Sequence, residues 1–205
     1  MNNQNQPTLT RIQQKNRDLI LQAALDAFSA QGFRGATLDQ IAESAGLSKP
    51  NVLYYFSSKD EIYRTLLTIL LDTWLAPLRE LNPQGDPMGE VLSYVRAKLD
   101  LSRDYPRESR LFANEILQGA PHLSELLGGG LRSLVDEAVT TLAAWIEQGR
   151  LAPVDPHHLI FSIWALTQHY ADFEVQVRAV LGPGHDPYAE AGPFLDNLYR
   201  RMLVV

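Results

Sequence analysis

The stretch TLDQIAESAGLSKPNVLYYF, residues 37–56, decides the fold of the first part of the chain. Thr37 and Ser48 are residues that commonly cap the start of a helix. Gly46 lies between the two capped segments, and Pro50 falls in the first turn of the second one, where a missing N–H does no harm. The stretch therefore predicts two short helices joined by a tight turn.

Small and apolar residues in these two helices are spaced as in a helix-turn-helix that reads DNA. Such a unit has a small residue where its helices touch, a glycine in the turn, and an apolar residue on the second helix that packs back on the first. Ala42, Gly46 and Val52 stand at these positions, and no acid lies between Gly46 and Ser58 to repel phosphate. The pattern predicts a DNA-binding unit, and the alternative is a helical hairpin with a structural role alone.

Donor side chains remain on the outer face of the second helix. A hydroxyl, an ammonium, an amide and a phenol at this face can reach phosphate oxygens or base edges. They belong to Ser48, Lys49, Asn51 and Tyr54. The net charge of the chain is -6, but residues 1–60 hold six basic residues against five acidic ones. A contact with a polyanion is therefore expected at this end.

The remaining sequence also predicts helices. Apolar residues recur with a 3.6-residue period, and no alternating β-branched run is long enough for a strand. The length of 205 residues, with 45% hydrophobic and 20% charged residues, suits a folded chain. We predict an all-α protein, with one helix over 11–31 closed by Gly32 and another that begins at Ser58 and kinks near Pro77.

Glycine and proline predict further boundaries. The run 128–130 is all glycine and predicts a break before a helix over 131–148. Asp155 and Pro156 form a cap and first turn, and Gly182 is followed by a proline, so one helix of about 26 residues is expected between them.

The composition excludes several kinds of site. Without cysteine there is no disulfide, thiolate metal site or cysteine nucleophile. The chain has no signal-like start and no apolar run of about 18 residues, so we expect a soluble, cytoplasmic protein with no membrane partner. No phosphate loop, nucleophile elbow or paired-histidine motif is present. We therefore predict no enzyme and no cofactor.

Histidines late in the chain leave a rival interpretation open. His169 and Asp172 are three residues apart and can share a helix face, whereas His157 and His158 precede them by three turns. If these side chains converged, the protein would be a helical metal-binding enzyme or ligand carrier. A solvated face or support of a nearby pocket is the simpler interpretation, so we predict no metal.

The order of these segments resembles the TetR family of one-component repressors. The resemblance rests on the first helix, the stretch 37–56, the following SSKDEIY (57–63) and a diverged helical body. It implies that the second and third helices form the DNA reader and that Lys59 holds phosphate. Leu53 stands where the family usually has an aromatic residue, so it is assigned no contact. The predicted DNA-binding residues are then Thr37, Ser48, Lys49, Pro50, Asn51, Tyr54 and Lys59.

Four segments of the body are similar to the RutR-like pyrimidine-utilisation regulators within this family. They are WLAPL (74–78), SRDYP (102–106), LAPVDPHHLIF (151–161) and WALTQHYADF (164–173). The likeness spans residues 17–181 and implies a repressor of pyrimidine metabolism genes whose effector is uracil or thymine. A different small planar ligand is the alternative.

The domain division that follows from this resemblance places an amino-terminal arm and helix-turn-helix in residues 1–57. Residues 58–205 then form the helical domain that binds effector and dimerises. In the family the last two long helices of each subunit pair, which would place the two DNA-reading units about 34–36 Å apart on a near-palindromic operator. The apolar seam would consist of Phe173, Val177, Val180, Phe194, Leu198 and Met202.

The candidate effector site follows from the needs of a flat, neutral base. Such a ligand requires an apolar or aromatic face and an amide edge. Phe161, Trp164 and Gln168 fall on one helical stripe and can supply both. Candidates for the facing wall are Trp74, Leu78, Phe112, Asn114 and Glu115. The alternative is that these aromatic residues are core, as residues at helical spacing usually are.

Overall fold

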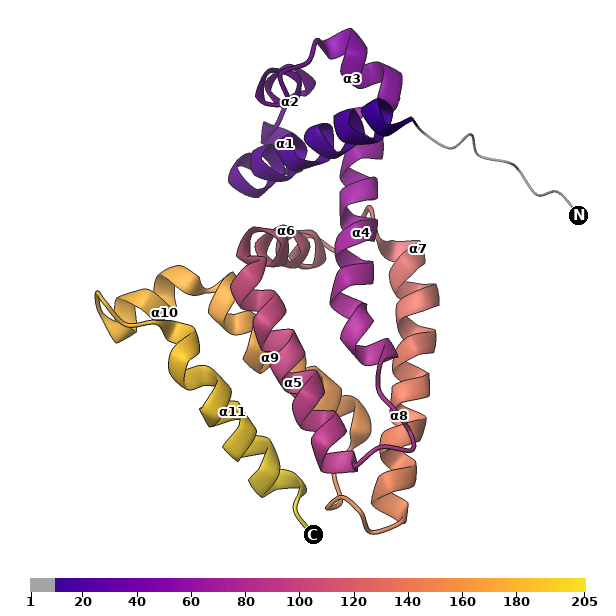
Figure 1. Ribbon diagram of the computed structural model, residues 1–205, viewed down its shortest axis with the longest axis vertical. Helices are drawn as coiled ribbons and strands as arrows, with labels where there is room; N and C mark the ends of the chain where they lie inside the picture. The colour runs from indigo at the N-terminus through magenta and orange to yellow at the C-terminus, as the bar shows by residue number, and fades with distance from the viewer. Residues whose placement is uncertain (1–9) are drawn as a thin grey trace, which may run out of the picture. The chain divides into compact units, whose positions relative to one another are not determined.

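The computed structural model describes residues 10–205, and within that range it contains helices and no strand (Figure 1). The predicted all-α class is confirmed. The amino-terminal arm predicted at the start of the chain falls largely on residues 1–9, which lie outside the described residues. The chain forms two compact units that divide after Thr68.

The first unit contains three helices and the start of a fourth. These are α1 (Arg11–Gly35), α2 (Leu38–Ser44), α3 (Lys49–Tyr55) and the first half of α4 (Lys59–Arg79). The predicted caps are confirmed: the Thr37 side chain accepts from the Gln40 N–H, and the Ser48 side chain accepts from the Asn51 N–H. Each cap satisfies an N–H that the first helical turn leaves without an intrahelical partner.

Gly32 interrupts the first helix where the sequence predicts its end. Its backbone has φ 69° and ψ 173°, which lies outside the helical region and is accessible mainly to glycine. A short turn then carries the chain to Gly35.

The division between the units falls within α4, eleven residues beyond the boundary expected at 57/58. The first turns of α4 pack into the first unit, because Ile62 and Tyr63 are buried there. The Tyr63 ring lies 4.9 Å from that of Phe28 and 4.8 Å from that of Phe33, measured between centroids. The helix continues through Pro77 and ends at Arg79.

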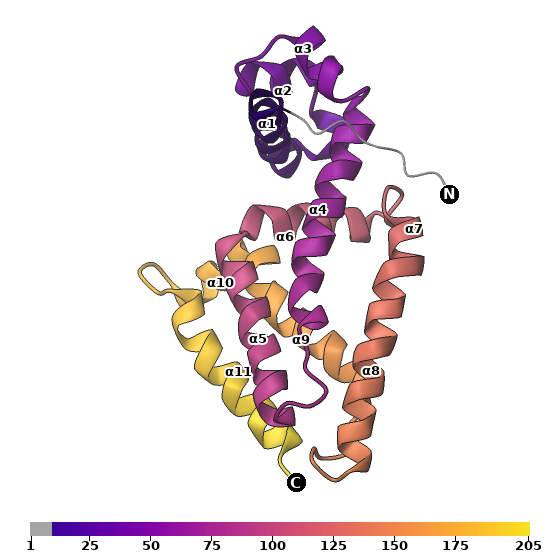
Figure 2. The same ribbon diagram turned by 45° about the vertical axis from the view of Figure 1, so that its right-hand side comes forward.

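The second unit is built from the rest of α4 and seven further helical segments. Their bounds are α5 (Pro87–Asp104), α6 (Pro106–Leu117), α7 (Ser124–Leu126), α8 (Arg132–Glu147), α9 (Pro156–Asp172), α10 (Glu174–Leu181) and α11 (Pro187–Leu203). A π-helical turn, η1 (Leu127–Leu131), joins α7 to α8. α5 packs against α9 and α11, and Figure 2 shows α6 crossing one end of this layer.

Two helix boundaries predicted in this unit are wrong. The glycines at 128–130 do not break the chain but form the π-helical turn, because glycine permits a break without requiring one. The helix expected to continue from 156 to 181 ends at Asp172, and α10 begins after Phe173. A contact with a distant residue competes with continuation of the helix at this point, since an Arg110 N–H donates to the Ala171 carbonyl at 3.2 Å.

None of the described helices is long and apolar enough to cross a membrane.

Candidate functional site

The α2–α3 pair has the geometry that its sequence predicts. Ala42 is 3% exposed and Val52 is fully buried, so the two helices touch through a small and an apolar side chain. Gly46 adopts φ 67°, and the Leu47 N–H donates to the Ala42 carbonyl at 2.9 Å, which closes α2 with a Schellman-type turn.

The predicted DNA-contacting residues of α2 and α3 share one property, which is exposure to solvent. They are Thr37, Ser48, Lys49, Pro50, Asn51 and Tyr54. Two of them already have partners from neighbouring helices: the Tyr54 hydroxyl accepts from Gln13 Nε2 at 3.2 Å, and Lys49 Nζ lies 3.0 Å from Asp39 Oδ2. DNA would have to compete with Asp39 for the Lys49 ammonium.

Lys59 has a structural role in addition to any contact with DNA. Its ammonium donates to the Phe33 carbonyl at 2.7 Å and to the Ala36 carbonyl at 2.8 Å, and it lies 4.5 Å from the centre of the Phe33 ring. The side chain therefore binds carbonyls after Gly32 at the carboxyl end of α1, as a cation at a helix carboxyl end does. One of its three N–H donors remains for phosphate.

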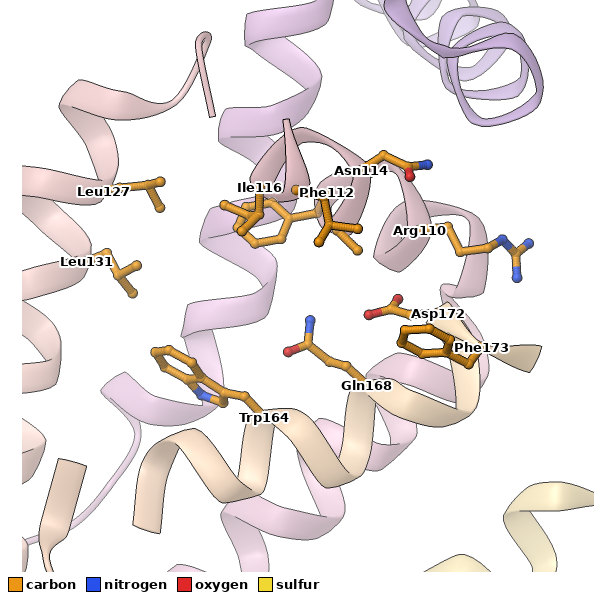
Figure 3. Close-up of a pocket in the computed structure, with 12 residues that line it drawn as sticks. Arg110, Phe112, Asn114, Ile116, Leu127, Leu131, Trp164, Gln168, Asp172 and Phe173 are labelled. Carbon is orange, nitrogen blue, oxygen red and sulfur yellow. The ribbon is translucent and has the colours of Figure 1, made fainter. Parts of the chain in front are cut away.

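A pocket of about 790 Å³ lies in the second unit between α6, η1 and α9. Its volume falls within the range of about 300–1,000 Å³ that is common for small-molecule sites. Figure 3 shows Trp164 and Gln168 of α9 facing Phe112 and Ile116 of α6. The leucines of η1 close one end, and Asp172 lies toward the other.

Gln168 is the polar group best placed in this pocket to recognise a ligand. In the described part of the chain no hydrogen bond engages its amide, and apolar side chains form most of the pocket wall. The neighbouring Trp164 is held in place by a hydrogen bond to α5, because its Nε1 donates to the Tyr94 hydroxyl at 2.6 Å. Tyr94 is buried in α5, and burial raises the pKa of its phenol, which keeps it neutral.

The structure brings together some of the predicted effector residues and separates others. Trp164, Gln168, Phe112 and Asn114 line the pocket, although Asn114 is exposed. The four that do not line it are Trp74, Leu78, Glu115 and Phe161.

Each of these four residues packs elsewhere. Leu78 belongs to the hydrophobic core of the second unit, and Phe161 is 47% exposed beside His158. The Glu115 carboxylate accepts from the His122 backbone N–H at 2.7 Å and so fixes the turn after α6. Trp74 is buried near Lys98 of α5.

Several polar residues of the second unit escaped sequence analysis. The Ser109 hydroxyl donates to Asp172 Oδ1 at 2.5 Å, and Arg110 binds Glu174 at 3.0 Å. Lys98 is 2% exposed, and its position on the same helical stripe as Val91 and Val95 was a signal of its burial.

The histidines do not assemble a site. Within residues 10–205 no three histidine or acidic side chains are placed to hold a metal ion. His157 and His158 lie beside Phe161, and the His169 ring stacks on Phe173 with 5.1 Å between centroids.

Apolar side chains are exposed on α10 and α11. The exposed fraction is 79% for Val180 and 56% for Phe194, and Met202 is 38% exposed. Leu198 differs, because it is half-buried and packs against the core. A groove lined partly by Val177, Val180 and Phe194 runs between these helices and α9.

Both units match known protein families. Residues 20–66 match the description "Bacterial regulatory proteins, tetR family", and residues 67–204 match "YcdC-like protein, C-terminal region". The HTH-type transcriptional regulator RutR of Escherichia coli O157:H7 is 53% identical over 173 residues, which is 84% of this chain and 82% of RutR. The repressor NicS of Pseudomonas putida is 30% identical over 72% of this chain and 70% of NicS.

Solved structures support the fold. The putative regulator SCO4942 from Streptomyces coelicolor has a TM-score of 0.70 at 24% identity and covers 92% of this chain and 98% of its own. AibR in complex with isovaleryl coenzyme A and operator DNA has a TM-score of 0.69 at 16% identity. The match covers 89% of this chain and 97% of the AibR chain. The sequence relatives RutR and NicS are named as a transcriptional regulator and a repressor and not as enzymes, which removes support from the metal-binding enzyme alternative. The chain belongs to the TetR family of DNA-binding transcriptional regulators and is closely related to RutR.

Proposed function

We propose that the protein is a repressor that binds a near-palindromic operator as a homodimer and responds to uracil or thymine. DNA contacts come from the exposed residues of α2 and α3, with Lys49 and Asn51 at base edges and Tyr54 and Lys59 at phosphates. A repressor acts on chromosomal DNA, so the proposal places the protein in the cytoplasm.

The effector part of the proposal is supported by one observation above all. The Gln168 amide lies without a hydrogen-bond partner from the described residues, next to the Trp164 indole, in an otherwise largely apolar pocket. A pyrimidine alternates N–H donors and carbonyl acceptors around a flat ring, so one amide can pair with its edge while an indole covers its face. The 53% identity to RutR, whose likeness implies pyrimidine metabolism, points to the same class.

Dimerisation is proposed through α10 and α11. The residues predicted for the seam include the exposed Phe173, Val180, Phe194 and Met202. Apolar side chains gathered on one face of two helices are typical of a surface that a second copy covers. TetR regulators act as dimers, and this pairing would give the symmetry that a palindromic operator requires.

Coupling between ligand and DNA would pass through α4, which contributes residues to both units. Effector lowers operator affinity only if it binds the DNA-incompetent arrangement more tightly. A coupling of about 1–3 kcal/mol changes operator affinity by roughly 5- to 150-fold.

The test combines DNA selection with ligand titration. Duplexes selected by the protein from a random pool are used in fluorescence anisotropy, with uracil, thymine, adenine and isovaleryl coenzyme A as additions. We expect the two pyrimidines alone to change operator affinity, and Gln168→Leu to abolish that change while binding the operator as the wild type does. An unaltered response in Gln168→Leu would place the ligand elsewhere, and a response to adenine alone would exclude the pyrimidine class.

A further inference from the structure

Side chains on one face of α1 contact the aromatic residues at the end of α3. Gln13 and Arg17 are four residues apart and so lie on the same face of the helix. Gln13 Nε2 donates to the Tyr54 hydroxyl at 3.2 Å, and the Arg17 guanidinium lies 4.4 Å from the centre of the Phe56 ring. The position of Tyr54, which is predicted to contact DNA, is therefore set in part by α1.

The Gln13 amide has a fixed orientation. Its Oε1 accepts from the Thr10 backbone N–H at 2.9 Å, as one half of the capping box that starts α1. A backbone N–H can only donate, so the amide atom that it binds must be the oxygen. The other amide atom is then the NH2 nitrogen, which can only donate. The hydrogen bond between Gln13 and Tyr54 therefore has one possible direction.

This direction determines where the Tyr54 hydroxyl hydrogen points. A phenol has one O–H hydrogen and can donate and accept at the same time. Because the Tyr54 oxygen accepts from Gln13, its own hydrogen points away from that amide, and across residues 10–205 no acceptor binds it. The Tyr54 side chain is also 69% exposed. Its hydrogen is therefore available to an acceptor oxygen outside the protein.

Tyr55 forms the same kind of hydrogen bond but is half-buried. Its hydroxyl accepts from Asn16 Nδ2 at 3.0 Å, and its ring packs edge-to-face on that of Tyr54 with 5.1 Å between centroids. This contact and the one between Arg17 and Phe56 hold α3 against α1 without Gln13. A change at Gln13 is therefore expected to affect the Tyr54 hydroxyl and to leave α3 in place.

We infer that Gln13 is a positioning residue for DNA binding. It holds the Tyr54 phenol as an acceptor toward α1, so that the phenol donates its hydrogen to a phosphate oxygen of the operator. The inference rests on the proposed function, which places Tyr54 at a phosphate. It adds a residue that acts through Tyr54 and links the first turn of α1 to the strength of operator binding.

Two substitutions of Gln13 separate its two hydrogen bonds. Gln13→Glu keeps an acceptor for the Thr10 N–H but replaces the donor with a carboxylate oxygen, which would accept the Tyr54 hydrogen. Gln13→Lys is the matched control, because it keeps N–H donors for the phenol and has no acceptor for the Thr10 N–H. Each substitution is combined with Tyr54→Phe, so that the effect of the changed charge on DNA binding cancels within each pair.

Fluorescence anisotropy with the operator selected by the wild type measures the effect of Tyr54→Phe in each background. In the wild type we expect affinity to fall by about 10-fold, because each subunit loses a hydrogen bond to a charged phosphate. In the Gln13→Glu background the same substitution should lower affinity by about 2-fold or less. In the Gln13→Lys background it should again lower affinity by about 10-fold.

Thermal unfolding without DNA distinguishes positioning from a structural role. Gln13→Glu retains the capping box and adds a negative charge to the first turn of α1, so its Tm should stay unchanged or rise. Gln13→Lys loses the acceptor of the cap and adds a positive charge there, so its Tm should fall. A loss of the Tyr54 effect that merely followed stability would therefore occur in Gln13→Lys and not in Gln13→Glu.

Each outcome decides either this inference or the proposed function. If Tyr54→Phe lowers affinity equally in the wild type and in the Gln13→Glu background, the inference is wrong and the phosphate contact of Tyr54 stands. If the Tyr54 effect is lost in the Gln13→Lys background as well, the helix cap and not the donor positions the phenol, which also overturns the inference. If Tyr54→Phe leaves wild-type affinity unchanged, the proposed phosphate contact is wrong and the inference fails with it.

Discussion

The two units of this regulator differ in where their polar side chains lie. In the first unit, hydroxyl and amide groups such as those of Thr37, Ser48 and Asn51 lie at the surface, where caps and solvent satisfy them. In the second unit, Trp74 and Lys98 are buried with few partners or none. A surface that reads DNA can be built from neighbours in sequence, whereas a ligand pocket depends on groups that only the tertiary fold brings together.

The largest expected effect tests the exposed apolar surface of the second unit. Phe194→Glu would bury a charge in the proposed α10–α11 interface, so we expect a monomer. Operator affinity should then fall by about 10²- to 10⁴-fold, because the second half-site contact is no longer intramolecular. Phe194 is a better position than Leu198, whose packing against the core would confuse dissociation with unfolding.

Val175→Glu is the control for this experiment. Val175 lies on α10 and is 86% exposed, but it does not belong to the predicted seam. Sedimentation should find Val175→Glu dimeric and Phe194→Glu monomeric. A dimeric Phe194→Glu variant would show that the subunits meet through another surface.

The first unit was predictable from sequence because its structure is set by local rules. The caps at Thr37 and Ser48, the turn at Gly46 and the stop at Gly32 each depend on residues within one or two turns. Prediction from neighbouring residues failed where a distant residue forms a hydrogen bond with the backbone of a helix. The end of α9 at Asp172 coincides with the hydrogen bond from Arg110 to the Ala171 carbonyl, which is invisible in a 3.6-residue period.

The pocket was predictable in part for the same reason. Trp164 and Gln168 share one helix, so their spacing places them on one face. The facing wall comes from other helices, and sequence could not indicate that Glu115 turns toward His122 or that the η1 leucines close the pocket. Lys98 was hidden by its charge, although its neighbours on the stripe are apolar.

The prediction of intermediate size concerns the buried Lys98 side chain and the change of protein stability with pH. Between the folded-state pKa of about 7 and the ordinary lysine value of 10.5, the unfolded chain holds a proton on Lys98 that the folded chain lacks. Wild-type stability should therefore rise with pH in this window, whereas Lys98→Met removes the dependence. We expect the variant to be more stable at pH 7 and this advantage to shrink by on the order of 2 kcal/mol by pH 9.

Lys49→Met gives the matching measurement in the first unit. Lys49 is exposed and pairs with Asp39 at the surface. The difference in unfolding free energy between Lys49→Met and the wild type should therefore be the same at both pH values. Denaturant unfolding at pH 7 and pH 9 provides the comparison. An advantage of Lys98→Met that stays constant with pH would show that Lys98 remains charged in the folded protein.

The smallest expected effect separates two lysines of the DNA-reading unit. The Lys59 ammonium binds the Phe33 and Ala36 carbonyls, whereas Lys49 forms one exposed ion pair. Lys59→Ala should therefore lower stability by about 1 kcal/mol, and Lys49→Ala should leave it nearly unchanged. If Lys59 also holds a phosphate, Lys59→Ala reduces the slope of log affinity against log salt by about one unit. An unchanged slope with lowered stability would make Lys59 a helix cap alone, and the first unit would then share with the second a lysine whose role lies inside the fold.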